Sequence, residues 1–282
     1  MRNIFEILQE STEILTQSGV AEPRREAHSL LAFALQKNKT FLIAHPEFEL
    51  TENEANYFQS ILTRRANREP FQYITGIQEF YGLDFEVTKD VLIPRPETEM
   101  IVENALEILQ NSDNPQFCEV GTGSGCISVS ILHNLPNATA IGLDISEKAL
   151  AITRKNAENH NVLNRLELKK SDIFNSLEDE KFEIIVSNPP YISSEDFGNL
   201  QIEVIAFEPQ IALTDSRNGL TIIEKIVKDA PDFLKPDGFL LMEIGFDQSE
   251  TVEKMFSSEI WQSVEILPDL QGIPRMVKAK IK

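Results

Sequence analysis

The sequence has few cysteines and no long apolar run. Its two cysteines, Cys118 and Cys126, lie close together, so a disulfide framework is not expected and a reducing cytoplasm fits the chain. No apolar run approaches the length of a membrane-spanning helix, and the N-terminus lacks the charged-then-apolar pattern of a signal peptide. We therefore expect a cytoplasmic protein that does not interact with a membrane.

Histidines and basic side chains are also sparse. The four histidines are scattered without ligand spacing, so no metal site is expected. There are 26 basic against 45 acidic side chains, a net charge of −19, which argues against a large nucleic-acid footprint. The acidity favours a basic protein partner or simply maintains solubility. The exception is a basic group, Arg64, Arg65 and Arg68, which we expect to be a solvated helix C-terminus favoured by the helix dipole.

The 282 residues, 41% of them hydrophobic, are enough for two domains. Helical periodicity predicts a bundle over residues 1–69, with helices at Asn3–Ser18, Pro23–Gln36 and Glu52–Asn67. In residues 70–95 the helical periodicity ends. Apolar and polar residues alternate at period two in Gln72–Ile74 and Phe80–Val87, which predicts a β-hairpin linking two domains.

From residue 96 to residue 282 strands and helices alternate. Strands are predicted at Phe117–Val120, Ala138–Leu143, Leu166–Leu168, Phe182–Val186, Phe239–Ile244, Ser263–Leu267 and Arg275–Ile281. Helices are predicted at Cys126–Asn134, Ser146–His160, Leu220–Leu234 and Gln248–Phe256. Repeated βα units imply an α/β fold with a doubly wound, mostly parallel sheet, which binds ligands at the carboxyl ends of its strands.

The first of these strands ends in a glycine-rich turn. It comprises Glu119, Val120, Gly121, Thr122, Gly123, Ser124 and Gly125. Glycines permit the sharp bend and let a ligand approach bare backbone. The G-T-G-S-G spacing differs from the G-x-G-x-x-G of dinucleotide sites, and the G-K-[ST] end of a phosphate loop is missing.

The next two strands end in acids. Asp144 is placed to accept both hydroxyls of a ribose, or it is a helix N-terminal carboxylate before Ser146. Asp172 could bind an adenine amino group while Ile173 covers the ring, or Asp172 is an ordinary loop acid. Arg95, held between two prolines, is a candidate site residue or pairs with a neighbouring glutamate, Glu97 or Glu99.

The fourth strand ends in Asn188-Pro189-Pro190-Tyr191. Each proline removes a backbone N–H, so the Asn188 side-chain oxygen and the fixed carbonyls form a rigid group of acceptors beside the flat ring of Tyr191. Such a group suits a planar –NH2, whose two hydrogens can be held by two acceptors. The competing interpretation is a proline-rich turn that only ends the strand.

Together these strand ends resemble the class I S-adenosylmethionine-dependent methyltransferases, in which an Asn-Pro-Pro-Tyr box serves a planar nitrogen acceptor. With Pro94-Arg95-Pro96-Glu97-Thr98-Glu99, Phe207-Glu208-Pro209 and Asp215-Ser216-Arg217-Asn218-Gly219-Leu220, essentially the whole chain resembles the peptide chain release factor glutamine N5-methyltransferase family (PrmC/HemK). Two positions depart from the family pattern. This chain has Ile173 where the family often has an aromatic residue, and it has Pro274, before Arg275, where the family commonly has an acidic residue.

The resemblance implies a seven-stranded catalytic domain over residues 96–282, a β-hairpin linker over 70–95 and a substrate-recognition bundle over 1–69. It implies methyl transfer from S-adenosyl-L-methionine to the glutamine of the Gly-Gly-Gln loop in class 1 release factors, modulating translation termination and yielding S-adenosyl-L-homocysteine. The implied cofactor residues are Glu119, Gly121, Thr122, Gly123, Ser124, Gly125, Asp144, Asp172, Ile173 and Asn188.

The catalytic and substrate residues follow from the box. They are Asn188, Pro189, Pro190 and Tyr191, with Arg95 as a further substrate contact. Asn188 and the Pro189 carbonyl are expected to hold the two amide hydrogens. The alternative activity is adenine-N6 methylation of a nucleic acid, which needs base flipping and a cationic groove that the net charge does not favour. A monomer with no nucleic-acid partner is expected.

Overall fold

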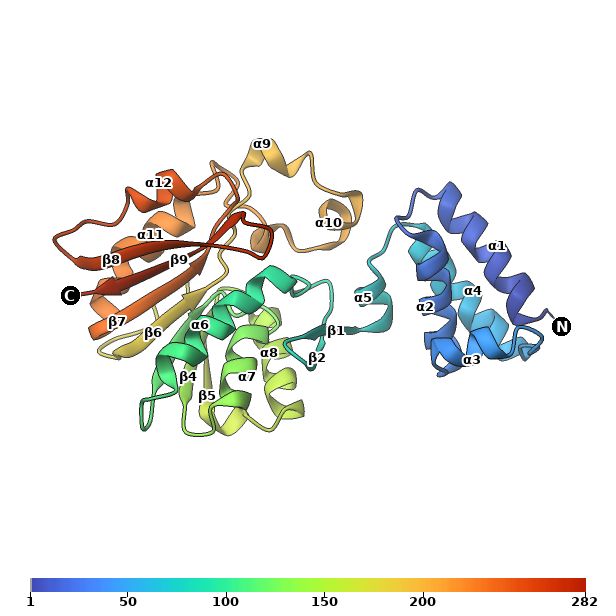
Figure 1. Cartoon of the computed structure of the whole chain (residues 1–282), viewed down its shortest axis with the longest axis horizontal. Coiled ribbons are helices and arrows are strands. Elements are labelled where there is room, and N and C mark those ends of the chain that lie inside the picture. The colour runs from blue at the N-terminus through green and yellow to red at the C-terminus, as the bar shows by residue number, and fades with distance from the viewer. Residues whose placement is uncertain (1) are drawn as a thin grey trace. The chain divides into compact units, whose positions relative to one another are not determined.

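The computed structural model describes residues 2–282 and divides into two compact units (Figure 1). The first, here the helical unit, contains the chain up to Gly76 together with Gln201–Phe207. The second, here the sheet unit, contains Ile77–Leu200 and Glu208–Lys282. The short segment Gln201–Phe207 therefore packs with the helical unit, although the chain on both sides of it belongs to the sheet unit.

The helical unit is built from α1 (Ile4–Gln17), α2 (Pro23–Leu35), α3 (Lys39–Ala44), α4 (Glu52–Ala66), α5 (Phe71–Thr75) and α10 (Ile202–Phe207). The predicted helices α1, α2 and α4 are confirmed, and each of their ends agrees with the prediction to within one residue. Capping boxes begin two of them, since the Asn3 and Thr51 side chains each accept a hydrogen bond from the third helical N–H. Their apolar faces enclose one core of buried aliphatic side chains and Phe58.

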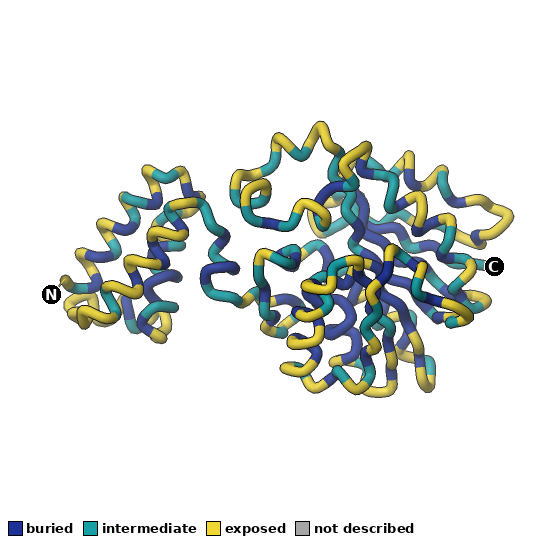
Figure 2. Tube along the Cα trace, turned by 180° about the vertical axis from the view of Figure 1, so that it is seen from behind, coloured by how far each residue is buried: buried dark blue, intermediate teal, exposed yellow. Residues whose placement is uncertain are grey.

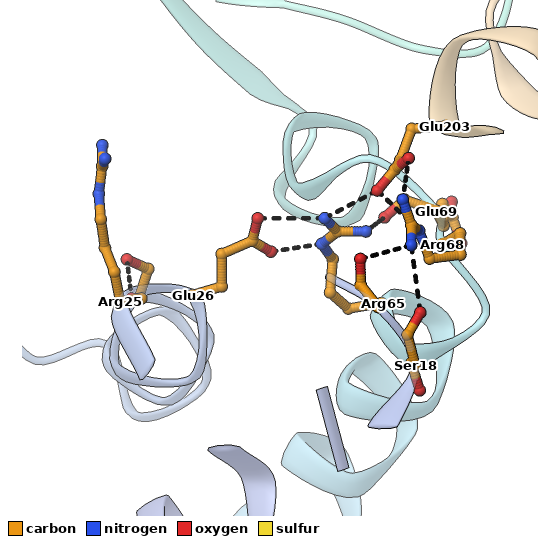
Figure 3. Close-up of polar contacts among 9 residues, drawn as sticks. Ser18, Arg25, Glu26, Arg65, Arg68, Glu69 and Glu203 are labelled. Atoms are coloured by element: carbon orange, nitrogen blue, oxygen red, sulfur yellow. Dashed lines mark hydrogen bonds and ion pairs between the residues drawn. The ribbon is translucent and has the colours of Figure 1, made fainter. Parts of the chain in front are cut away.

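The basic group at the end of α4 is not the solvated terminus expected from the sequence. Arg65 is only 4% exposed, and its guanidinium bonds Glu26 of α2 and Glu203 of α10 (Figure 3). Arg68 makes a bidentate pair with Glu203, at 2.8 and 2.6 Å, and also donates to the carbonyl oxygen of Ser18. The prediction fails for Arg65 because acids distant in the sequence pair with it.

The hairpin comprises β1 (Ile77–Phe80) and β2 (Leu83–Glu86), paired antiparallel. The prediction was wrong for Gln72–Ile74, which lies in α5 rather than in a strand. Three residues of alternation are too few to decide between strand and helix, and Gly76 ends α5 in the left-handed conformation, with φ +79°.

The sheet unit contains seven hydrogen-bonded strands in the order β5-β4-β3-β6-β7-β9-β8. They are β3 (Gln116–Val120), β4 (Thr139–Asp144), β5 (Leu166–Lys170), β6 (Phe182–Ser187), β7 (Leu234–Glu243), β8 (Trp261–Pro268) and β9 (Pro274–Ile281). The first five are parallel and β9 runs antiparallel to both β7 and β8. The doubly wound, mostly parallel sheet predicted from the βα repeat is confirmed.

Helices cover both faces of this sheet (Figure 1). The larger ones are α6 (Glu99–Leu109), α7 (Cys126–Asn134), α8 (Glu147–Asn159) and α11 (Thr221–Asp229), with short α9 (Ser194–Phe197) and α12 (Ser249–Glu253). Short 3-10 turns are η1 (Pro96–Thr98), η2 (Leu163–Arg165), η3 (Gln210–Ala212) and η4 (Ala230–Phe233). The sequence pattern did not predict the three short helices α3, α9 and α10.

The central strands are mostly apolar because both of their faces are buried (Figure 2). In β6, Ile184 and Val186 join the core under α6 and α7, whereas Ile185, between them, joins the core under α11. The chain winds from β3 outward to β5, then returns to β6 beside β3 and winds the other way. The strand order therefore reverses between β3 and β6, where open α/β sheets bind their ligands.

Candidate active site

A cavity of about 630 Å³ lies at this reversal, lined by residues of the sheet unit. The predicted site residues that line it are Arg95, Glu119, Gly121, Thr122, Gly123, Ser124, Asp144, Asp172, Ile173, Asn188 and Pro190. Gly125, Pro189 and Tyr191 are not among its lining residues. Side chains and backbone from four consecutive parallel strand ends thus meet at one place, as the sequence predicts.

The glycine turn is fixed to the neighbouring strand. Both Gly121 and Thr122 donate backbone hydrogen bonds to the carbonyl oxygen of Leu143, at 2.8 and 3.0 Å. Gly121 and Gly123 have positive φ, and a Cβ added to either would meet no atom within 4 Å, so a ligand can approach this backbone closely.

Gly125 has a different role in the structure. It also has positive φ, but a Cβ placed there would lie 2.6 Å from Thr153 Cγ2 of α8. The residue begins α7 and allows α7 and α8 to approach each other. Its predicted contact with a cofactor therefore has no support from the cavity lining, whereas its packing role follows from the geometry.

Glu119 is a buried carboxyl at the end of β3, 1% exposed. It accepts hydrogen bonds from Ser128 N (3.0 Å), Ser128 Oγ and Thr122 Oγ1 (3.2 Å). Burial raises its pKa to about 8, although the bonds from Ser128 and Thr122 act in the opposite direction. All three of these bonds reach Oε2, so Oε1 is the oxygen available to a ligand in the cavity.

Asp144 has the helix N-terminal role considered from the sequence, and its ribose-binding role stays a prediction. Its Oδ1 accepts from Ser146 N at the start of α8, at 2.8 Å, and its Oδ2 accepts from Gly123 N of the turn, at 2.9 Å. It also lines the cavity. Burial raises its pKa, and the backbone donors at Ser146 and Gly123 oppose that shift.

Ile173 has a strained backbone. Its φ of +53° is in the left-handed region, which costs a β-branched residue roughly 1–2 kcal/mol. The half-buried side chain lines the cavity beside exposed Asp172 and packs against the core under α11. Such strain persists where surrounding contacts determine the conformation, and it clusters at ligand sites.

The Asn-Pro-Pro-Tyr box is held by a hydrogen-bonded network. Asn188 Nδ2 donates to Thr98 Oγ1 at 3.0 Å, and Thr98 Oγ1 donates to Glu243 Oε2 at 2.6 Å. The Tyr191 hydroxyl donates to Glu243 Oε1 at 3.0 Å. Burial, followed by the charge of Glu243, raises the Tyr191 pKa far above its ordinary value, so the phenol keeps its proton.

Sequence reasoning missed Thr98 and Glu243. Glu243 is 3% exposed and is the last residue of β7. The available signal was an acid directly after the apolar run Phe239–Met242. Thr98 lies in the Pro94–Glu99 segment, and its sequence neighbours give no sign of a role distinct from that of Arg95. Both are buried polar residues that hold the box from outside it.

The alternatives for Arg95 are resolved in part. Its guanidinium pairs with Glu208, not with Glu97 or Glu99. Glu208 is 6% exposed and also accepts a hydrogen bond from Ile93 N at 3.2 Å. Arg95 nevertheless lines the cavity. Arg275, whose role the sequence left open, pairs with Asp269 at 3.2 Å.

The fold is that of the class I S-adenosylmethionine-dependent methyltransferases. Two solved structures share the fold, at low sequence identity. A methyltransferase from Pyrococcus furiosus has a TM-score of 0.52 and 19% identity, over 81% of this chain and 98% of that one. The hMettl16 catalytic domain in complex with MAT2A 3′UTR hairpin 6 has a TM-score of 0.58 and 15% identity, over 82% of each chain.

Sequence comparison defines the family. Residues 6–76 match the PrmC N-terminal domain and residues 102–206 match the methyltransferase small domain. The release factor glutamine methyltransferase of Geobacter sulfurreducens is 40% identical over 99% of this chain and 96% of its own length. That of Koribacter versatilis is 38% identical over 93% of both. The chain belongs to the release factor glutamine methyltransferase family.

Other relatives are longer. A bifunctional methyltransferase of Rickettsia conorii is 36% identical over 98% of this chain, which spans 57% of the length of that relative.

Within residues 2–282 there is no helix both long and apolar enough to cross a membrane. In the same range, His, Cys, Asp and Glu side chains form no group of three or more suited to a metal ion.

Proposed function

We propose that the protein transfers a methyl group from S-adenosyl-L-methionine to the side-chain amide N5 of the glutamine in the Gly-Gly-Gln motif of class 1 peptide chain release factors. The observation that carries this proposal is the orientation of Asn188. Its Nδ2 is bound by Thr98, so Oδ1 is the atom left to accept a hydrogen bond at the cavity. An acceptor fixed in that way suits an N–H of a planar amide.

The cavity fits S-adenosylmethionine on three features. Backbone at Gly121 and Gly123 is open to close approach, and the carboxyl groups of Asp144 and Glu119 both line the cavity, where the first would accept the ribose hydroxyls. Two buried carboxyls also suit a ligand that carries positive charge. When bound, S-adenosylmethionine supplies a methyl group on a sulfonium, an electrophile that needs no metal or covalent enzyme intermediate.

The chain's own residues would activate the acceptor. An amide nitrogen is a poor nucleophile because its lone pair is delocalised into the carbonyl. In the proposal, Asn188 Oδ1 and the Pro189 carbonyl accept the two amide hydrogens, which reduces that delocalisation and stabilises positive charge developing on nitrogen. Fixing the reactants in one orientation contributes up to about 7–11 kcal/mol in favourable cases. Pro190 lines the cavity beside them.

The domain assignment belongs to the same proposal. Residues 1–69 recognise the release factor, residues 70–95 connect the two domains, and residues 96–282 catalyse methyl transfer. The match of residues 6–76 to the PrmC N-terminal domain supports it. So does the surface of the helical unit, on which large apolar side chains, including Phe5, Ile43 and Tyr57, are exposed. A cytoplasmic location, where release factors meet ribosomes, and action as a monomer complete the proposal.

The first experiment is methyl transfer from labelled S-adenosylmethionine to three acceptors. These are a purified class 1 release factor, its Gly-Gly-Gln glutamine→Ala variant, and duplex DNA. Label on the unmodified factor alone is the expected result. Label on the DNA would replace the proposed substrate with a nucleic acid while keeping the cofactor. Equal label on both forms of the factor would show that another residue is the acceptor.

A further inference from the structure

Glu243 is a costly group to bury in the sheet unit. It is 3% exposed, and its hydrogen-bond donors are two neutral hydroxyls, Thr98 Oγ1 and Tyr191 OH. Within residues 2–282 no lysine or arginine forms a salt bridge with it, because Arg275 pairs with Asp269 instead. Burial raises the pKa of Glu243, and the charge of Arg275 opposes that shift only in part. Burying a carboxylate without a paired cation costs several kcal/mol. The position of this acid next to the box therefore calls for a functional explanation.

The sheet places this acid beside the box. Strands β6 and β7 are parallel, and Ser187 lies opposite Met242 in their register. The next residues along the two strands are Asn188 and Glu243, so both emerge at the same carboxyl edge. Thr98, at the end of η1, connects them. Three separate segments therefore meet through two hydrogen bonds of 2.6 and 3.0 Å.

The direction of these hydrogen bonds determines how the Asn188 amide is turned. Glu243 accepts hydrogen bonds from both the Thr98 and the Tyr191 hydroxyls, so the single hydroxyl proton of Thr98 goes to Glu243. The Thr98 oxygen then has only lone pairs left for its other neighbour. It can accept from an –NH2 but cannot donate to a carbonyl oxygen, so Asn188 must present Nδ2 to Thr98 and direct Oδ1 away from it.

We propose that Thr98 and Glu243 are positioning residues that fix the amide orientation of Asn188, and that the same carboxylate holds Tyr191 through its hydroxyl. This inference rests on the proposed glutamine methylation for its catalytic meaning, but the orientation itself is a property of the free protein. If the Asn188 amide were rotated by 180°, its –NH2 group would face the substrate in place of the Oδ1 acceptor. The –NH2 group of the substrate would then lose one of its two hydrogen-bond acceptors.

The test uses Thr98→Val, which keeps the shape of the side chain and removes the hydroxyl, and Thr98→Ser, which restores the hydroxyl. We expect Thr98→Val to lower kcat about 10- to 100-fold, with the KM for S-adenosylmethionine changed less than twofold. Thr98→Ser should recover at least a third of wild-type kcat. Ser130→Ala, which removes a buried hydroxyl that has no partner among the described residues, should leave both constants unchanged.

A second measurement does not need a methyl acceptor. The side-chain NH2 signals of Asn188 are assigned by nuclear magnetic resonance from their loss in Asn188→Asp. In the wild-type protein the hydrogen bonded to Thr98 should exchange slowly with solvent, and in Thr98→Val and Glu243→Leu this protection should fall at least tenfold. Equal protection in all three would overturn the proposal. If the wild type methylates no release factor but the protection falls, glutamine methylation fails while the positioning network stands.

Discussion

At the scale of single residues, the box depends on one oxygen atom. Asn188→Ala removes the acceptor that would hold an amide hydrogen but leaves the glycine turn, Glu119 and Asp144 in place. Loss of one such preorganised partner costs about 10²–10³-fold in kcat. Steady-state kinetics with a release factor should therefore show that loss, with cofactor affinity measured by calorimetry changing little. An equal fall in cofactor affinity would instead make Asn188 a cofactor or structural residue.

A second prediction at this scale concerns Glu119. Burial raises its pKa to about 8, so the free protein carries a proton there at pH 7. An unfolded glutamate has a pKa of about 4.3. The folded state thus binds more protons than the unfolded state between these values, and Glu119 lowers stability progressively as pH rises from about 4 through about 8.

Cofactor binding should show the opposite trend. A positively charged ligand favours the ionised carboxylate, so affinity for S-adenosylmethionine should rise several-fold from pH 6.5 to pH 8.5, with a proton released on binding near pH 7. Calorimetry in buffers of different ionisation enthalpy measures that release. Glu119→Gln should abolish it, whereas an unchanged proton release in the variant would assign the titration to another group.

Which site residues the sequence could predict depends on how local their signals are. The glycine turn, Asp144, Asp172 and Asn188 each follow a strand, and parallel strands bring their carboxyl ends together, so their convergence was predictable. Thr98 and Glu243 act only through contacts between segments 145 residues apart in sequence. Arg95 likewise pairs with Glu208 rather than with its near neighbours, because tertiary contacts decide between equally plausible acids.

At the scale of elements, the packing of α7 against α8 depends on Gly125. A Cβ there would lie 2.6 Å from Thr153 Cγ2, and φ is +80°. Overpacking costs typically 1–3 kcal/mol and left-handed strain roughly 1–2 kcal/mol more. Gly125→Ala should therefore lower the free energy of unfolding by about 2–5 kcal/mol in urea titrations.

Two variants separate the steric part of this effect from the backbone part. Adding Thr153→Ser to Gly125→Ala removes the clashing methyl group and should recover about 1–2 kcal/mol. Gly123→Ala, where a Cβ meets open space, should cost only the backbone strain but weaken cofactor binding, because that space faces the cavity. Equal destabilisation by the two glycine substitutions would contradict the packing role of Gly125.

The helical unit depends on Arg65 in the same way. Arg65→Ala would leave Glu26 and Glu203 without their shared guanidinium, and the Arg65 side chain is 5% exposed while those of Glu26 and Glu203 are 22% and 13% exposed. Removing one partner of a buried pair costs about 3–5 kcal/mol, and the partial exposure of the glutamates places this case near the lower end. Arg25→Ala, which breaks an exposed pair with Glu22, should change stability by less than about 0.5 kcal/mol. Similar losses in both variants would show that the Arg65 network adds nothing specific.

The same elements show where sequence reasoning stops. Helices with strong periodicity, such as α1 and α4, and strands bounded by turns were predictable to within a few residues. Elements of four to six residues, such as α3, α9 and α10, are too short to show a period. Glu203 in α10 pairs with Arg65 and Arg68 of the helical unit, contacts between distant segments that no local pattern reveals.

At the scale of the whole molecule, the net charge of −19 makes a prediction about the partner. If the acidic surface attracts a basic face of the release factor, association is accelerated by long-range electrostatics, which salt screens. The Debye length falls from about 10 Å at 0.1 M salt to about 3 Å at 1 M. The kcat/KM for the release factor should then fall about tenfold over that range.

The small cofactor provides the internal control for this experiment. S-adenosylmethionine enters a cavity in which two carboxyl groups, those of Glu119 and Asp144, are buried and therefore poorly screened, so its KM should change much less with salt. A common fall in both constants would indicate a general effect of salt on the enzyme. A kcat/KM for the release factor that does not depend on salt would mean that the acidic composition maintains solubility and that recognition rests on apolar contacts, such as those available at Phe5 and Ile43.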